Sequence, residues 1–223
     1  VYHPIHAERQ VIKGIDINVR KGEVVGIAGL MGAGRTEFAM SLFGRSYGRR
    51  VTGEVLLKGK PIDVSSVSKA VEHGIAYVTE DRKTYGLNLI DHIKHNITLA
   101  NLPGVSRHSV IDDMRELAVA NDYKAKTNIR SSSVYQMTGN LSGGNQQKVM
   151  VGRWMSQDAK LFILDEPFQG VDISARRDIA AKLRASADGR ATLLFVTELD
   201  RNEDIDLERL LAEVAGGPLH SAA

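Results

Sequence analysis

The chain has 223 residues, enough for one large domain or two small ones with a buried core. Its 29 lysines and arginines and 27 aspartates and glutamates leave a net charge of +2, which argues against a dedicated nucleic-acid-binding protein. The absence of cysteine excludes disulfides and thiolate metal sites. No stretch reaches the roughly 18–20 apolar residues of a membrane-spanning helix, and no apolar leader is visible. These properties indicate a soluble, cytosolic, single-domain protein.

The first 44 residues predict two strands, a glycine-rich loop and a helix. Residues 10–19 alternate apolar and polar side chains, as a half-buried strand does. Residues 23–28 (EVVGIA) form the short apolar run typical of a buried parallel strand, and residues 29–34 are rich in glycine. From Arg35 the pattern is helical, and Gly44 is a natural stop.

The rest of the chain alternates buried strands with helices, which predicts an α/β fold with a mostly parallel sheet covered on both faces. Residues 51–64 predict two short strands, an antiparallel β region at the edge. The segment from about 87 to 155 lacks strong strands, so we expect a helical subdomain inserted into a single domain spanning residues 1–223. The further elements expected are a helix at 68–73, a strand at 75–79, a strand at 161–164, a helix at 175–183 and a strand at 192–197.

Residues 29–36 (GLMGAGRT) match the phosphate-loop pattern GxxxxGK[ST] at all positions but one. The glycines let backbone N–H groups surround a phosphate, and the following helix N-terminus favours negative charge. Thr36 would place a hydroxyl on Mg²⁺. Arg35 stands where the pattern has Lys, and its larger planar head does not reach the same oxygens in the same way. The alternative is a glycine turn without a ligand.

Residues 141–148 (LSGGNQQK) indicate a second phosphate-binding turn. Ser142 can cap a helix that starts at Gly143 and Gly144, whose bare backbone lets a phosphate approach closely. The alternative is an ordinary helix cap beside flexible glycines.

Residues 161–167 (LFILDEP) predict a buried strand that ends in two acids. At the carboxyl end of this strand, Asp165 can hold Mg²⁺ through water and Glu166 can polarise an attacking water. The alternative is an acidic turn on the surface, which the preceding apolar run makes the poorer interpretation.

Together and in this order, with Gly144 about 20 residues before Asp165, the motifs resemble the ATP-binding domain of ABC transporters over nearly the whole chain. The resemblance implies a P-loop NTPase core that binds ATP and Mg²⁺. It makes residues 141–148 the signature segment and Asp172 part of the D-loop. Tyr2 stands where the family stacks an aromatic ring on adenine; the alternative is a frayed terminal residue. The phosphate-loop residues implied are Gly29, Gly32, Ala33, Gly34, Arg35, Thr36 and Glu37.

Three segments, GLMGAGRTE, YVTEDRK and LSGGNQQKV, resemble in sequence the second, C-terminal nucleotide-binding domain of a class of tandem ATPases. These ATPases serve monosaccharide importers for ribose, xylose, galactose or arabinose. This implies an ATPase at the cytoplasmic face of the inner membrane. Its partners would be the N-terminal nucleotide-binding domain, or a second copy in isolation, the permease subunits and, indirectly, an external sugar-binding protein, with no nucleic acid. A start at Val1 fits an excised half of such a protein.

Four positions depart from an active site of this family. Arg35 replaces the phosphate-loop Lys and Glu37 a second Ser or Thr, while Glu80 stands at the Q-loop Gln and Glu198 at the switch His. An ionised Glu only accepts hydrogen bonds, so we expect weak γ-phosphate binding unless Mg²⁺ or protonation offsets the charge. The alternative is that each of these glutamates points to solvent, and for Glu80 that it pairs locally with its basic neighbours Arg82 and Lys83.

The family's two-domain sandwich, in which each ATP lies between one phosphate loop and the other domain's signature, implies a division of roles. Ser142, Gly143 and Gly144 would complete the partner's site, while this chain's own loop forms a degenerate site. Glu166 is present, which leaves weak turnover open, so the catalytic candidates are Glu166, Glu80 and Glu198.

Two other functional classes stay open: a non-transport ABC ATPase acting on DNA or ribosomes, and a structural or regulatory lobe that never binds nucleotide. A further expectation concerns the end of the chain. After residues 192–197 the family continues through a helix and a strand that have no counterpart here. We expect about 20 residues of the natural chain to be missing between Glu198 and Asn202, with a terminal helix at 205–214; the alternative is a genuine deletion.

Overall fold

The computed structural model describes residues 1–6, 8–185 and 189–197. The expectations for Glu198, for a missing stretch near 198–202 and for a helix at 205–214 lie outside these residues. In chain order the main elements are β1 (Val24–Gly29), α1 (Arg35–Leu42), β2 (Val55–Leu57), β3 (Lys60–Ile62), α2 (Val67–Glu72), β4 (Ile75–Val78), α3 (Ile93–Thr98), β5 (Ser106–Arg107), β6 (Val110–Ile111), α4 (Asp113–Lys126), α5 (Gly143–Met155), β7 (Leu161–Asp165), α6 (Ile173–Ala185) and β8 (Ala191–Thr197). A π-helical turn at Arg82–Gly86 and 3-10 turns at Leu99–Val105 and Thr138–Asn140 complete the described set.

The centre of the fold is a four-stranded parallel sheet in the order β1-β8-β7-β4. Its strands are apolar on both faces, and Ile163, Leu164 and Phe195 are fully buried. Because all four strands run in the same direction, their carboxyl ends meet at one edge, where ligand sites of open α/β sheets lie. The predicted α/β class with a parallel sheet is confirmed.

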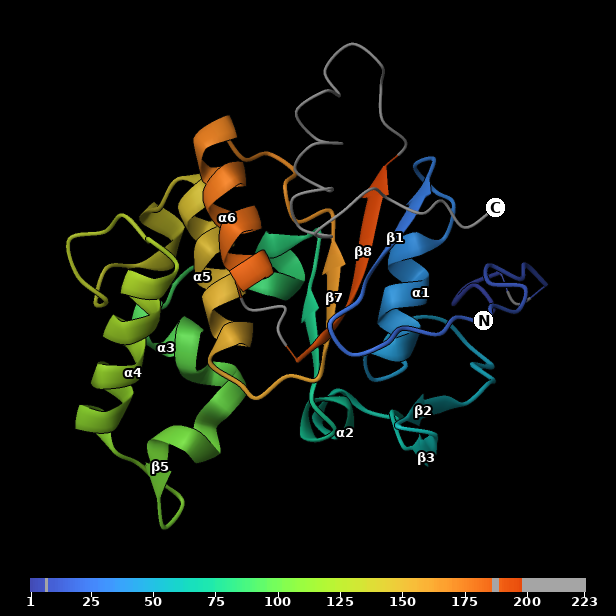
Figure 1. Cartoon of the computed structure of the whole chain (residues 1–223), viewed down its shortest axis with the longest axis horizontal. Helices are drawn as coiled ribbons and strands as arrows, with labels where there is room; N and C mark the ends of the chain where they lie inside the picture. Colours follow the sequence, from blue (N-terminus) through green and yellow to red (C-terminus); the bar gives the residue numbers. More distant parts are fainter. Residues whose placement is uncertain (7, 186–188, 198–223) are drawn as a thin grey trace.

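Helices lie on either side of this sheet (Figure 1). Helix α1 packs against β7, and α5 packs against β4 and α6. The ring of Phe38 on α1 meets that of Phe195 on β8, with centroids 5.9 Å apart in an edge-on arrangement. At the carboxyl end of α1, Phe43 meets Trp154 near the carboxyl end of α5 at 5.5 Å. One apolar core therefore joins the sheet to both helix layers.

Residues 87–155 contain the helices α3, α4 and α5, which pack on one another, and the short β5–β6 hairpin. Figure 1 shows α3 and α4 at the side of the molecule away from β1. The small antiparallel pair β2–β3 forms the predicted β region outside the main sheet.

The strand expected at residues 10–19 is wrong. Residues 11–20 form no strand, and Gln10 makes only an isolated bridge to Tyr2. Ile15 and Ile17, which the alternation assigned to a buried face, are 49% and 39% exposed. In the described part of the chain β1 pairs with β8 alone, so this segment has no neighbouring strand to satisfy its backbone.

Candidate functional site

The glycine loop leaves the carboxyl end of β1 and turns into α1. Gly32 and Gly34 have φ of +81° and +91°, a left-handed conformation that side chains disfavour. A Cβ at Gly32 would meet open space, whereas one at Gly34 would lie 3.1 Å from Ile12. The loop closes through a 3.1 Å hydrogen bond from the backbone N of Ala33 to the carbonyl of Leu30. No side chain covers the Cβ position of Gly32, so its backbone is open to the approach of a phosphate, as a phosphate-binding loop requires.

The cation at the start of α1, Arg35, is bound to Glu166, the acid that directly follows β7. Nη1 of Arg35 donates a 2.9 Å hydrogen bond to Oε1 of Glu166, and their side chains are only 11% and 15% exposed. The predicted phosphate ligand and the predicted catalytic carboxylate therefore neutralise each other in this structure. Arg35 makes this bond with one N–H of its planar guanidinium, which carries several donors in a fixed fork.

Asp165, the last residue of β7, is 1% exposed, and the hydroxyl of Tyr77 on β4 donates to its Oδ2 at 3.0 Å. Burial raises the pKa of this carboxyl, and the nearby charges of Glu80 and Glu166 raise it further. Hydrogen bonds from Thr36 and Tyr77 oppose that rise. A buried carboxylate with an elevated pKa beside two more acids is a place where a bound cation would relieve charge repulsion.

The backbone of Glu166 is strained. Its φ of +45° is left-handed, which is uncommon for a residue with a side chain. Its N–H donates to the carbonyl of Phe195 on β8 at 3.1 Å, and its own carbonyl accepts from Gln169. Both bonds fix the turn, so the side chain is aimed back at Arg35 across the carboxyl edge of the sheet.

Glu80 follows the carboxyl end of β4 and is half-buried. Its charge contributes to the raised pKa of both Asp165 and Tyr77, so it belongs to the same acidic group. The local pairing considered for it does not involve Arg82, whose guanidinium donates to the side chain of Gln147 and the carbonyl of Gln169. The structure thus brings Glu80, Asp165 and Glu166 together at one edge.

The signature segment starts α5, and Ser142 is its N-cap residue as expected, but the side chain of Ser142 does not make the capping hydrogen bond. Ser142 occupies the cap position without a side-chain bond to the helix backbone; its hydroxyl accepts from Nδ2 of Asn145 at 3.0 Å. Gly144 is required by packing, since a Cβ there would lie 2.9 Å from the Cβ of Ala175 on α6. The hydroxyl of the exposed Ser142 consequently remains at the surface beside the first backbone N–H groups of α5.

A second group of site residues surrounds this helix start. Asp172 caps α6 by accepting from the N–H of Ala175 at 2.9 Å, and its Oδ2 lies 3.4 Å from the Cβ position of Gly144. The backbone carbonyl of Gly170 is 3.1 Å from the Cβ position of Gly143. Arg82 lies at the same place, 3.6 Å from that position, and burial lowers its pKa. Sequence reasoning considered Arg82 only as a local partner of Glu80 and did not assign it to the signature segment; its place two residues after Glu80 was the available signal.

The acidic group at the end of the sheet and the residues around the start of α5 lie at different places. Helices α1 and α5 touch near their carboxyl ends, at Phe43 and Trp154. Gly144 precedes Trp154 by ten residues along α5, which is about 15 Å of helix. Figure 1 shows α1 and α5 separated by the strands of the sheet. The described contacts of the signature are to α6 and Arg82, whereas those of the glycine loop and the start of α1 are to residues 11–12 and to the end of β7.

The remaining predicted residues of the described chain are Tyr2, Glu37 and Gly29. Tyr2 is not frayed: its backbone bonds to Arg49 in both directions at 3.0 and 2.9 Å, and the guanidinium of Arg50 lies 5.9 Å from the ring centroid. Glu37 is half-buried in the first turn of α1, and its charge adds to the burial that raises the pKa of Tyr47. Gly29 ends β1, with the side chain of Arg35 next to it.

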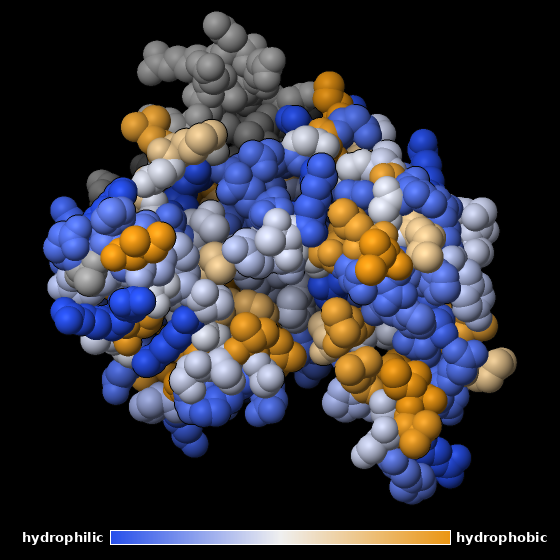
Figure 2. All heavy atoms as spheres, turned by 180° about the vertical axis from the view of Figure 1, so that it is seen from behind, coloured by the Kyte–Doolittle hydropathy of each residue, from blue (hydrophilic) through white to orange (hydrophobic). Residues whose placement is uncertain are grey.

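The surface carries hydrophobic residues in several separate patches on a largely hydrophilic face (Figure 2). Two large side chains of the glycine loop, Leu30 and Met31, are 66% and 82% exposed.

Within residues 1–6, 8–185 and 189–197, no helix is long and apolar enough to cross a membrane.

The sequence pattern of the ABC transporter family matches residues 12–169. The chain is 49% identical over 200 residues to the L-arabinose transport ATP-binding protein AraG of Geobacillus stearothermophilus, covering 89% of this chain and 39% of that protein. It is 41% identical over 192 residues to the xylose import ATP-binding protein XylG of Thermoanaerobacter pseudethanolicus, covering 86% and 38%. The chain thus spans about two-fifths of the length of the curated relatives it matches.

Solved structures share the fold at low identity. A dimeric bacterial ABC transporter cassette superposes with a TM-score of 0.71 at 20% identity, covering 90% of this chain and 83% of that one. A dimeric cassette in a post-hydrolysis state with bound ADP and Pi gives 0.69 at 21% identity, covering 86% and 81%.

Proposed function

The chain belongs to the ABC transporter family, and on that premise we propose that it is the ATP-binding domain of a monosaccharide importer. The observation that carries this proposal is the meeting of the glycine loop, Asp165 and Glu166 at one edge of the sheet, in a chain 49% identical to an arabinose transport ATP-binding protein. The 41% identity to a xylose import protein supports a pentose or related sugar as the cargo class.

We propose that ATP and Mg²⁺ are held at this edge. The backbone N–H groups around Gly32 and Gly34 would contact phosphate, and the hydroxyl of Thr36 with the carboxylate of Asp165 would hold the metal. The donor set fits: both are oxygen ligands, which Mg²⁺ prefers, and the buried Asp165 lies among acids that a cation would neutralise. Tyr2, held beside Arg49, would stack on the adenine.

We propose that this site is degenerate. The Arg35–Glu166 ion pair occupies both the phosphate-loop cation and the carboxylate that would polarise water. Glu80 adds a negative charge where a γ-phosphate would approach, and Glu37 and Glu198 extend the departure from an active site. Binding should therefore be weak and hydrolysis by this site slow.

We propose that Ser142, Gly143 and Gly144, with Asp172 beside them, complete the active site of a partner domain. Two features support this: the signature contacts α6 and not the chain's own glycine loop, and Leu30 and Met31 stand exposed in the loop, where a partner would cover them. The partner would be the N-terminal nucleotide-binding domain of a tandem protein, or a second copy in isolation, with this chain as the C-terminal half. The relatives are long enough for a second domain of this size.

In this arrangement residues 87–155 form the helical subdomain of a single domain spanning 1–223. The domain would lie peripherally at the cytoplasmic face of the inner membrane, against permease subunits that receive sugar from an external binding protein.

Titration of the chain with a fluorescent ATP analogue, with and without Mg²⁺, tests the proposal. We expect weak saturable binding that Mg²⁺ strengthens. Asp165→Asn should remove the effect of Mg²⁺, while Asp158→Asn, at an exposed position before the amino end of β7, should not. Absence of saturable binding would contradict the proposal and favour a structural lobe. Double-stranded DNA in the same assay should not compete; competition would favour a non-transport ATPase.

A further inference from the structure

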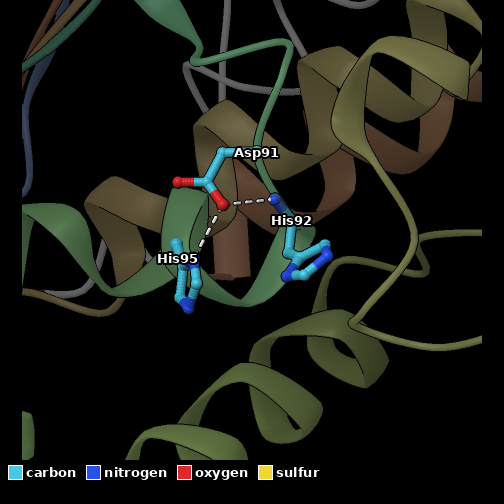
Figure 3. A group of neighbouring side chains, drawn as sticks. All are labelled: Asp91, His92 and His95. Carbon is cyan, nitrogen blue, oxygen red and sulfur yellow. Dashed lines mark hydrogen bonds and ion pairs between the residues drawn. The ribbon is translucent and has the colours of Figure 1, made fainter.

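Two histidines and an aspartate gather on the first turn of α3, away from the site described above. Nδ1 of His95 lies 2.7 Å from Oδ1 of Asp91, four residues earlier. His92 lies one residue after Asp91, and its ring centroid is 5.5 Å from that of His95. The ligand atoms of the three side chains all lie within 4.8 Å of one another. Figure 3 shows both rings on the same side of the turn, with the carboxylate above His95.

From this geometry we infer that Asp91, His92 and His95 form a binding site for a late first-row divalent metal ion such as Zn²⁺. Two imidazole nitrogens and one carboxylate oxygen are a ligand set that suits Zn²⁺, Ni²⁺ and Cu²⁺, and not Mg²⁺ or Ca²⁺. Three protein ligands leave further positions for water, which reaches the site because the side chains of His95 and Asp91 are 44% and 34% exposed.

The contact between His95 and Asp91 is somewhat shorter than the spacing of two ligands on one ion. Ligands bound tetrahedrally at about 2.0–2.2 Å from Zn²⁺ lie about 3.3–3.6 Å apart. The 2.7 Å contact found here therefore has to widen by less than about 1 Å to admit an ion. An ion would take the place of the shared proton between Nδ1 and the carboxylate. His92 lies on the same helix face, three residues from His95, and a turn of its ring completes the set.

The surrounding backbone holds the ligands in place. Oδ1 of Asp91 accepts from the N–H of His92 at 2.7 Å, and the carbonyl of Asp91 accepts from the N–H of Thr138 at 2.9 Å. His92 also forms a β-bridge with Met137. Because these bonds already fix the backbone of Asp91 and His92 and the carboxylate of Asp91, a metal ion would have to order fewer groups on binding.

Positive charge near the site is already neutralised. Lys94, the one residue between the two histidines with a cationic side chain, donates to Asp113 and lies 2.8 Å from Oε2 of Glu116. Its ammonium is therefore turned toward α4 and compensated, so it does not repel a cation at the imidazoles.

Calorimetric titration of the chain, free of any polyhistidine tag, with Zn²⁺ tests the inference. We expect one ion per chain, and an affinity lowered by about tenfold to a hundredfold or more in His95→Ala and Asp91→Asn. Binding of Co²⁺ in place of Zn²⁺ should give visible absorption bands of a nitrogen–oxygen site. The matched control is the double variant His3→Ala/His6→Ala, which removes a second close histidine pair of the described residues, at 5.1 Å between ring centroids, and should bind as the parent does.

His92→Ala keeps the test decisive if His95→Ala fails to fold, because the His92 ring makes ring contacts with Tyr135 and His95 and its backbone supplies the hydrogen bond to Asp91. The absence of a stoichiometric site, unchanged affinity in the α3 variants, or loss of binding in the His3/His6 variant would overturn the inference. None of these outcomes depends on ATP, so the proposed function stands or falls separately.

Discussion

Arg35, the first residue of α1, donates a hydrogen bond of 2.9 Å to the carboxylate of Glu166, which follows the last residue of β7. The two residues are 131 positions apart in sequence and almost buried. The bond joins the two elements that the motifs assign to phosphate binding and to water activation. Arg35 stands where the phosphate-loop pattern has Lys, and through this bond it neutralises the carboxylate that would activate water.

A double-mutant cycle measures this ion pair. We expect Arg35→Gln and Glu166→Gln each to lower the free energy of unfolding. The double variant should lose less stability than the two single variants together, with a coupling free energy of about 1–3 kcal/mol. Each variant removes one charge from a nearly dry pair and leaves the other without its closest counter-ion. Urea unfolding of the four proteins gives the coupling. Strict additivity would show that the pair is not formed in solution.

Two glycines of α5 should respond oppositely to the same substitution. Gly144→Ala places a Cβ 2.9 Å from that of Ala175, so α5 and α6 must move apart, at a cost of about 1–2 kcal/mol. Gly152→Ala meets Thr127 at 3.4 Å, an ordinary contact, and should gain about 0.5–1 kcal/mol from helix propensity. Thermal unfolding compares them; equal effects would refute the packing explanation for Gly144.

The ion pair between Lys148 and Asp178 predicts a pH dependence. Oδ2 of Asp178 lies 2.7 Å from Nζ of Lys148, and this bond lowers the pKa of the carboxyl. The stabilisation is therefore present above the unfolded-state pKa of about 4 and is lost as the pH falls through the lower folded-state pKa. Because Asp178 is 36% exposed, we expect Asp178→Asn to cost no more than about 1 kcal/mol at pH 7.

Urea unfolding at several pH values checks this dependence. The parent and Asp178→Asn should converge in stability as the pH falls below the unfolded-state pKa of about 4. A difference between parent and Asp178→Asn that is constant from pH 7 to pH 3 would contradict the assignment.

Arg153 is the centre of a buried network in α5. Its guanidinium donates to the carbonyl of Asn96 at 2.6 Å, to that of Gly86 at 2.5 Å and to Oδ1 of Asn96 at 2.7 Å. Burial lowers its pKa to about 10, which still leaves it charged at neutral pH. We expect Arg153→Lys and Arg153→Met both to cost about 2–4 kcal/mol, since neither supplies three donors in one plane.

Chemical unfolding measures these variants, with the exposed Arg115→Met as the control for loss of an arginine. Full stability of Arg153→Lys would show that the charge, and not the fork of donors, holds α3 to α5.

The sequence was sufficient for the parts of the fold that depend on local pattern. Apolar runs such as residues 161–164 and 192–197 became β7 and β8, because buried parallel strands must be apolar on both faces. The strand predicted for residues 10–19 was wrong, because alternating apolar and polar residues form a strand only where another strand is available to pair with them. The glycine at 144 was assigned to phosphate access, whereas the structure also shows it as the contact between α5 and α6.

The motifs located the site residues, but not the bonds between them. Nothing in the sequence predicts that Arg35 reaches Glu166 or that Tyr77 donates to Asp165, because those bonds depend on the order of strands in the sheet. Arg82 was missed for the same reason, since its contacts to Gln147 and Gln169 join segments far apart in the chain.

The most direct test of the proposed division of roles is the steady-state rate of ATP hydrolysis by the chain alone and mixed with its proposed partner domain. Ser142→Arg, a bulky change at an exposed position that leaves the core of α5 intact, serves as the variant. We predict negligible turnover by the chain alone, clear turnover by the mixture, and loss of that turnover when this chain carries Ser142→Arg. Robust hydrolysis by the chain alone, or a mixture whose rate is unaffected by Ser142→Arg, would contradict the account.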